Sequence, residues 1–349
     1  MQTLSYTQAT NAVLACFRAK RTALLVGPPG IGKTALIRDV ATRVNLPLHT
    51  LIGSNCDAVD LAGLPWIRRG ELARAMYPEI AACMTAPGIL FLDELTTVPP
   101  SVQAPLMRLF LERCAGGQAL HADSVVVAAC NAPEHAPNAA ELSAATVNRI
   151  IRLHYVPTYD EIRRFFDGAD GREESLYRAE ARDFSATLAC EPGLLHLTPP
   201  QVSVDAGTPW GSPRAWEIGL AVLAQHGQDD DVGLALLAGA VGEDSALAYL
   251  AIKRLRARLP SVDAIIADPI GAVVPAERTH QIAALGLLSR VADQDVWAAW
   301  IYADRLTLEI GAAVARILMS RAPNNRARHV APGTAAQLRL LAKIRQGGK

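Results

Sequence analysis

The sequence predicts an α/β domain built on a parallel sheet, followed by an all-helical region. Short apolar runs alternate with longer helical patterns from residue 1 to about 155, and this alternation is typical of a parallel α/β sheet. From about Ser212 the composition becomes helical and rich in Ala and Leu. The chain has 349 residues, more than one hydrophobic core usually organises, so two domains are expected.

The sheet is predicted to contain five apolar runs. They are residues 23–26, 48–52, 88–92, 124–130 and 149–155. Residues 89–92 and 125–129 are apolar at every position, which is typical of strands covered on both faces. Right-handed crossovers between such strands place the strand ends at one edge of the sheet, beside the loop that follows the first run.

The chain is predicted to have four parts. They are an α/β core over residues 1–156, a helical linker or insert over 157–205, a helical segment over 206–260 and a C-terminal helical extension over 261–349. The stretch 157–200 is richer in charge and ends in Pro and Gly. Helical patterns then cover 214–226, 232–241, 245–259 and 279–319, and a polar loop at 324–333 precedes a last short basic helix.

The composition offers no global electrostatic attraction to nucleic acid or to an anionic membrane, although it leaves open a local basic patch. The 34 basic and 34 acidic residues cancel. The six cysteines are scattered, with no C-x-x-C pair, as expected for buried thiols in a reducing compartment. The first residues show no export signal, and the longest apolar stretch, around 232–241, is too short to cross a bilayer. We therefore expect a cytoplasmic protein with no membrane contact.

A glycine-rich loop between the first of these apolar runs and a helical pattern is a complete phosphate-binding P-loop. The predicted nucleotide-binding residues are Gly27, Pro28, Pro29, Gly30, Ile31, Gly32, Lys33, Thr34 and Ala35. The glycines let backbone N–H groups turn around phosphate oxygens, Lys33 adds a charge at the β- and γ-phosphates, and Thr34 offers a hydroxyl to Mg²⁺. The alternative is a Gly/Pro turn that happens to precede Lys-Thr. The strand–loop–helix context favours a site for a nucleoside triphosphate such as ATP, with Mg²⁺.

Two acids end the apolar run at 88–92. Asp93, at the strand tip, is placed to hold Mg²⁺, directly or through water. Glu94 points differently and can polarise a water for in-line attack on the γ-phosphate. The alternative is an acidic N-cap for the next helix. The position of the pair, sixty residues after the P-loop lysine, favours the catalytic interpretation.

Asn131 and Arg149 flank the last two predicted strands. Asn131 closes one strand, so it is expected beside Asp93 and Glu94, where an uncharged donor can orient the attacking water; locally it could equally be a turn residue. Arg149 opens the final strand, where it could reach the P-loop of a neighbouring subunit and stabilise charge on the phosphate. The spacing alone leaves open a surface arginine favoured by a helix end.

Arg214 begins the first helix of the second region. Ser212 would cap this helix with Pro213 at its first position. An arginine here could touch the γ-phosphate in cis and couple nucleotide state to domain angle, although position alone does not decide this. The eight histidines show no ligand spacing, so no metal beyond Mg²⁺ is expected, and the run Lys253, Arg254, Arg256 and Arg258 is interpreted as a solvated face or a docking surface.

These motifs resemble those of the AAA+ ATPases, and within them the MoxR-like branch. The most specific stretch is residues 91–107, FLDELTTVPPSVQAPLM, which is similar to the Walker B strand of that family and the helix after it. Residues 60–63, ahead of a hairpin-like segment at 66–72, and residues 131–149 and 212–215 are similar to further motifs in the same order. Ile150 departs from the family, which more often has Phe after the arginine. The resemblance covers roughly residues 5–260.

The resemblance implies a parallel five-stranded core with a helical lid and ATP between them. It also implies that Asn131 is a sensor 1 residue, that Arg149 is an arginine finger acting in trans, and that Arg214 is a sensor 2 residue. Family members assemble into rings, usually hexamers, and MoxR-like proteins typically act with a partner that carries a von Willebrand factor type A domain. The favoured function is therefore an ATP-driven motor or chaperone-like ATPase that remodels or activates a protein.

Two other functions share the same nucleotide-handling residues. A nucleic-acid-dependent ATPase is disfavoured by the neutral charge and by the lack of a basic and aromatic binding module. A regulatory switch that hydrolyses ATP slowly and signals through ring assembly is disfavoured, though not excluded, by the intact Asp93–Glu94 pair.

Overall fold

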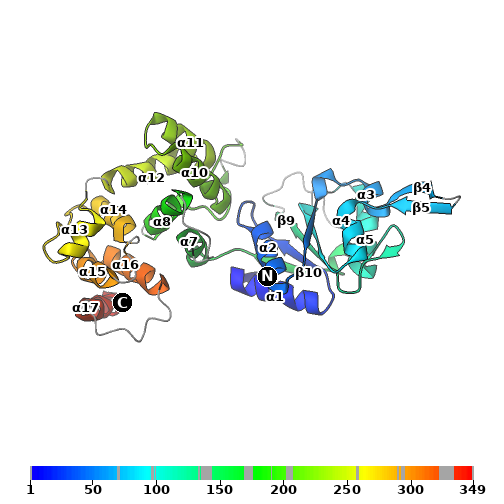
Figure 1. Cartoon of the computed structure of the whole chain (residues 1–349), viewed down its shortest axis with the longest axis horizontal. Coiled ribbons are helices and arrows are strands. Elements are labelled where there is room, and N and C mark those ends of the chain that lie inside the picture. Colours follow the sequence, from blue (N-terminus) through cyan, green and yellow to red (C-terminus); the bar gives the residue numbers. More distant parts are fainter. Residues whose placement is uncertain are drawn as a thin grey trace. The chain divides into compact units, whose positions relative to one another are not determined.

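The computed structural model describes residues 2–68, 71–95, 98, 100–132, 134, 144–168, 176–189, 191–201, 207–256, 259–288, 291, 295–321 and 334–347 (Figure 1). The chain folds into two compact units. The first contains residues 1–158 and 197–199, and the second contains residues 159–196 and 200–349.

The first unit is built on a parallel sheet of six strands. In chain order they are β1 (Thr3–Leu4), β2 (Ala23–Val26), β3 (Leu48–Ile52), β6 (Ile89–Asp93), β9 (Val125–Cys130) and β10 (Ile151–Tyr155). Their order across the sheet is β1-β10-β2-β9-β6-β3, and every neighbouring pair is parallel. The predicted parallel α/β core is confirmed, and its five strands agree with the structure to within two residues. The sixth strand was missed because β1 has only two residues, too few to show a pattern.

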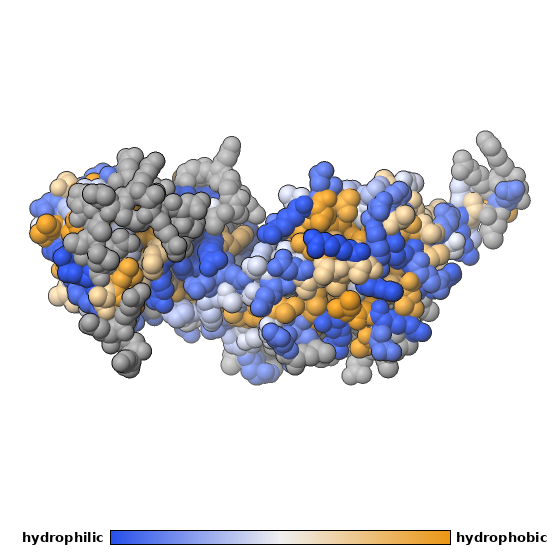
Figure 2. Space-filling view, turned by 90° about the horizontal axis from the view of Figure 1, so that it is seen from below, coloured by the Kyte–Doolittle hydropathy of each residue, from blue (hydrophilic) through white to orange (hydrophobic). Residues whose placement is uncertain are grey.

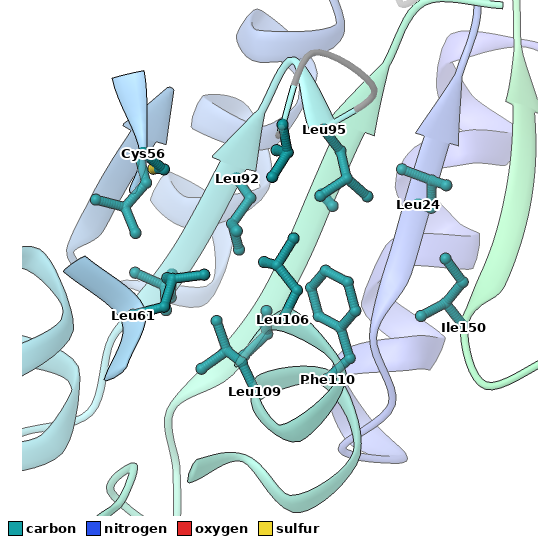
Figure 3. Packing of buried hydrophobic residues seen from close by; sticks show 14 of the residues in the cluster. Leu24, Cys56, Leu61, Leu92, Leu95, Leu106, Leu109, Phe110 and Ile150 are labelled. Atoms are coloured by element: carbon teal, nitrogen blue, oxygen red, sulfur yellow. The ribbon is translucent and has the colours of Figure 1, made fainter. Parts of the chain in front are cut away.

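Hydrophobic clusters cover both faces of this sheet, which explains the uninterrupted apolar strands. Alternate residues of β2 point to opposite faces, with Leu24 in one cluster and Leu25 in the other. The Leu25 face packs against α1 (Tyr6–Arg18) and α2 (Lys33–Val44). The Leu24 face packs against α4 (Pro78–Thr85) and α5 (Gln103–Glu112), with Leu106, Leu109 and Phe110 beneath the strands (Figure 3).

Two antiparallel hairpins extend this unit. β4 (Leu64–Arg68) pairs with β5 (Glu71–Ala75), and β7 (Cys114–Ala115) pairs with β8 (Gln118–Ala119). The hairpin-like segment expected at 66–72 is therefore part of the β4–β5 pair, which projects beyond α3 (Ala58–Ala62) in Figure 1.

On the face of the molecule shown in Figure 2, hydrophilic side chains lie among separate apolar patches.

The described part of the second unit is helical. Its longer helices are α7 (Tyr159–Asp167), α8 (Leu176–Leu188), α10 (Pro213–His226), α11 (Asp231–Val241), α12 (Glu243–Arg256), α13 (Val262–Ala267), α14 (Arg278–Leu288), α15 (Val296–Ala303), α16 (Leu308–Arg321) and α17 (Thr334–Gly347). The loop expected at 324–333 lies outside the described residues. Within the ranges that are described, no helix combines the length and the apolar character needed to cross a bilayer.

Helix α8 lies at the centre of the second unit, packed against α7, α10, α12 and α14. Phe184 of α8 stacks on Trp216 of α10, with ring centroids 4.1 Å apart, and meets Tyr249 of α12 edge to face. The segment expected to be a linker or insert thus contributes a core helix. The four-part division made from the sequence stays a prediction.

The structure changes the interpretation of the charge run at 253–258. Lys253 Nζ lies 2.8 Å from Glu180 Oε2 of α8, and both side chains are largely buried. The Tyr249 hydroxyl donates to the other oxygen of this carboxylate at 2.7 Å. The expected solvated face is wrong for Lys253, because a buried acid on α8 supplies its partner. Arg258 lies outside the described residues.

Candidate nucleotide-binding site

The P-loop occupies residues 27–32, between β2 and α2 at the carboxyl edge of the sheet. Gly27 has no room for a side chain, because a Cβ there would lie 2.3 Å from the carbonyl oxygen of Tyr155. Gly32 is the N-cap of α2 and has a φ of 91°, a left-handed conformation that favours glycine. The amino terminus of α2 therefore faces the loop, and its N–H groups and dipole favour an anion.

Lys33 is the first residue of α2, and its ammonium group connects two strand ends. Its Nζ donates to the carbonyl oxygens of Gly27 at 2.9 Å and Pro28 at 2.8 Å, and to Oδ1 of Asn131 at 2.8 Å. Asn131 directly follows β9, which pairs with β2 in the sheet. The pairing of β2 with β9 thus places Asn131 where it helps to hold the Lys33 ammonium against the loop. Lys33 is only 7% exposed.

Thr34 and Asp93 provide two adjacent oxygen ligands. The Thr34 hydroxyl donates to Oδ2 of Asp93 at 2.7 Å, and Asp93 is the last residue of β6. A hydroxyl and a carboxylate are hard ligands of the kind that Mg²⁺ prefers, and Mg²⁺ is usually held by few protein groups together with substrate phosphates. This pair therefore fits the Mg²⁺ ion expected from the sequence, which Thr34 and Asp93 could hold.

Glu94 leaves the strand in a left-handed conformation, with a φ of 57°. Its N–H donates to Oδ1 of Asp93 at 3.0 Å, and its carboxylate accepts a hydrogen bond from the Ser54 hydroxyl at 3.3 Å. Ser54 lies two residues after β3, which pairs with β6 so that Ile52 is opposite Asp93. Sequence reasoning missed Ser54, since no motif marks it. The pairing of the two strands, once known, brings it beside Glu94.

Arg149 lies apart from this group, and Arg214 belongs to the second unit. Arg149 follows α6 (Ala144–Val147), its N–H donates to the Thr146 carbonyl at 3.0 Å, and its side chain is exposed. Because β10 is parallel to β2, with Ile151 opposite Ala23, Arg149 lies at the edge of the sheet opposite the P-loop. Arg214 is the exposed second residue of α10, in the second unit. The structure thus brings together Lys33, Thr34, Asp93, Glu94 and Asn131.

Cys130, the cysteine next to this site, is a buried thiol. Burial raises the pKa of the Cys130 thiol to about 11, against the opposing charges of Lys33 and Arg152. The thiol is therefore protonated at neutral pH. Cys16, Cys56, Cys83 and Cys130 are buried free thiols, as expected, whereas Cys114 is partly exposed and Cys190 lies outside the described residues.

Comparison with known proteins places this site in a family. Residues 23–155, which include β2, the P-loop, Asp93, Glu94, Asn131 and Arg149, match the family model described as "ATPase family associated with various cellular activities (AAA)". This segment is an AAA ATPase domain. An AAA domain implies nucleotide binding.

Relatives with known names match part of the chain. The ATP-dependent zinc metalloprotease FtsH of Kosmotoga olearia is 42% identical over 76 residues, which cover 22% of this chain and 10% of that protein. The transcriptional regulatory protein XylR of Pseudomonas putida is 26% identical over 164 residues, 44% of this chain and 29% of XylR. The matches to the zinc metalloproteases span only 10% to 18% of those proteins.

Solved structures that resemble this chain show low sequence identity to it. A putative ATPase from Cytophaga hutchinsonii is 16% identical with a TM-score of 0.37, over 69% of this chain and 82% of that one. The RuvB Holliday junction branch migration motor of Thermotoga maritima is 15% identical with a TM-score of 0.37, over 75% and 80% of the two chains.

Proposed function

We propose that this AAA protein is an ATP-hydrolysing motor of MoxR-like type, which forms a ring, usually a hexamer, and remodels or activates a partner protein with a von Willebrand factor type A domain. The observation that carries the hydrolytic part is the pair of contacts Lys33–Asn131 and Thr34–Asp93. They connect the P-loop to the ends of the next two strands, β9 and β6. The MoxR-like assignment and the partner rest on the resemblance of residues 91–107 and of the motifs around them.

In this proposal the residues at the sheet edge divide the work of phosphoryl transfer to water. Lys33 exchanges its carbonyl partners for the β- and γ-phosphate oxygens, and Asn131 orients the attacking water with its side-chain amide. Glu94 polarises that water once its carboxylate turns from Ser54 toward the γ-phosphate. Thr34 and Asp93 hold Mg²⁺, which when bound would neutralise charge on the phosphate oxygens.

Each site is completed by a neighbouring subunit. Arg149 is exposed and lies at the edge of the sheet opposite its own P-loop, and this supports its assignment as a finger for the next subunit. A guanidinium supplied in trans is worth about 10³–10⁵ in rate. We assign Arg214 as the sensor 2 residue of a helical lid over 206–260, since it opens α10 behind the Ser212 cap.

A trapped complex tests the motor and its partner together. Glu94→Gln should bind ATP without hydrolysing it, so a pull-down with this variant in ATP and Mg²⁺ should recover a ring with its partner. Lys33→Ala under the same conditions is the control that lacks the nucleotide-bound state. Recovery of the ATPase alone with both variants would contradict an obligate partner. Turnover that requires DNA or RNA and falls steeply with salt would favour a nucleic-acid motor instead.

A further inference from the structure

One buried residue outside every motif contacts the P-loop at two points. Tyr155 is the last residue of β10 and is 1% exposed. Its carbonyl oxygen is the atom nearest to the missing side chain of Gly27, at the start of the loop. Its hydroxyl group donates to the carbonyl oxygen of Ile31, near the end of the loop, at 3.3 Å. Both ends of the loop therefore contact the same tyrosine.

The hydroxyl contact determines which way one peptide group of the loop faces. In a trans peptide the carbonyl and the following N–H point in opposite directions. When the Ile31 carbonyl is directed toward Tyr155 in the protein interior, the N–H of Gly32 is directed to the opposite, outer side of the loop. Loop N–H groups that point away from the protein interior in this way are the ones that can bind phosphate oxygens in P-loops.

The neighbouring glycines do not fix this orientation by themselves. Gly30 and Gly32, on either side of Ile31, have φ values of 77° and 91°, and glycine adopts positive and negative φ with similar ease. The orientation of the Ile31–Gly32 peptide depends on ψ of Ile31 and φ of Gly32, so Gly32 permits more than one orientation and a hydrogen bond from outside the loop can select one. Within the described part of the chain, the Tyr155 hydroxyl is a group placed to do so.

We propose that Tyr155 is a positioning residue for phosphate binding, which orients the Gly32 N–H toward the β-phosphate of the nucleotide through its bond to Ile31. The inference rests on the proposed nucleotide-binding function of the loop. It predicts that Tyr155 contributes to the preference for nucleoside di- and triphosphates over monophosphates, because a monophosphate has no β-phosphate for this N–H to meet.

Calorimetric titration of ADP and AMP into Tyr155→Phe tests the proposal, because the substitution removes only the hydroxyl. The Kd for ADP should rise about three- to tenfold, the effect of one ordinary hydrogen bond, and the Kd for AMP should stay unchanged. The ratio of the two constants is a readout that a general loss of stability would not change. Tyr302→Phe is the matched control: its hydroxyl also donates to a main-chain carbonyl, that of Val273, but in the second unit. It should leave both constants as in the parent.

The outcomes separate this proposal from the function on which it rests. If the parent protein binds no ADP, the nucleotide-binding function itself is wrong. If the parent binds ADP and Tyr155→Phe binds it equally well, or loses ADP and AMP affinity in the same proportion, the positioning role is wrong. Tyr155→Leu, which also lacks the hydroxyl, should repeat the fall in the ADP preference. Failure of both variants to fold would assign Tyr155 a structural role and overturn the proposal.

Discussion

Asn131 has two proposed roles, which variants of this residue can distinguish. One is to hold the P-loop lysine, and the other is to act on the substrate. In the structure its Oδ1 accepts from the Lys33 ammonium together with two loop carbonyls, all at 2.8–2.9 Å. Asn131→Ala removes this acceptor and leaves the two carbonyls. A hydrogen bond to a charged group is worth about 1.5–3 kcal/mol, and water can reach the half-buried site, so the free energy of unfolding of the first unit should fall by about 1–2 kcal/mol.

The same variant should also hydrolyse ATP more slowly, by a larger factor than any change in its affinity for ADP. Loss of a donor that acts on the transition state typically costs about 10²–10³ in kcat, so we expect a fall in kcat of about 10²-fold with the Kd for ADP changed by less than about threefold. The assay is steady-state ATP hydrolysis at saturating Mg²⁺ and ATP, beside urea unfolding of the same samples.

Asn131→Asp is the matched control for this prediction. It keeps an oxygen for Lys33 but lacks the amide donor, so it should retain the stability of the parent and still lose activity. Parent-like turnover in Asn131→Asp would refute the assigned role of the amide. Unchanged stability in Asn131→Ala would show that the contact with Lys33 contributes nothing to holding the loop.

Two further predictions follow from contacts that the sequence does not mark. Ser54→Ala releases the Glu94 carboxylate from its 3.3 Å hydrogen bond and should raise kcat about two- to fivefold, with ADP affinity unchanged; a fall in kcat would show that Ser54 aids catalysis. Asp304 accepts hydrogen bonds from Arg339 and Lys343 of α17. Burial favours the neutral form of this carboxyl, but the two basic side chains hold its pKa below the ordinary value. The stabilisation is therefore present above the unfolded pKa, near 4, and is lost as the pH falls through the lower folded pKa. The protection of α17 amides against hydrogen exchange, measured relative to their intrinsic exchange rate at each pH, should therefore fall in acid, and Asp304→Asn should remove this pH dependence.

The parts of the fold that the sequence predicts well are those with a local signal. Residues 89–92 and 125–129 are apolar at every position and appear in the interior strands β6 and β9, buried by helices on both faces. The P-loop and the acids at 93 and 94 are also local patterns, and their mutual contacts follow from the parallel arrangement of the strands. Asn131 lies beside the P-loop for the same reason.

Other features depend on tertiary contacts that no short pattern encodes. Ser54 and Tyr155 reach the site only because β3 pairs with β6 and β10 pairs with β2. Helix α8 was expected in a linker because it is rich in charge. Its residues Glu180 and Arg178 are nevertheless buried, with partners such as Lys253 on α12 for Glu180 and the Phe165 carbonyl for Arg178.

The central claim is that each site needs the Arg149 of a neighbouring subunit, and mixing two inactive variants tests it most directly. Arg149→Ala retains Glu94, and Glu94→Gln retains Arg149, so only a mixed ring can unite both groups at one site. With random exchange in a 1:1 mixture, about one quarter of the sites receive both, and about one quarter of the parent activity should return. Turnover by Arg149→Ala alone, or an inactive mixture whose subunits have been shown to exchange, would contradict the account.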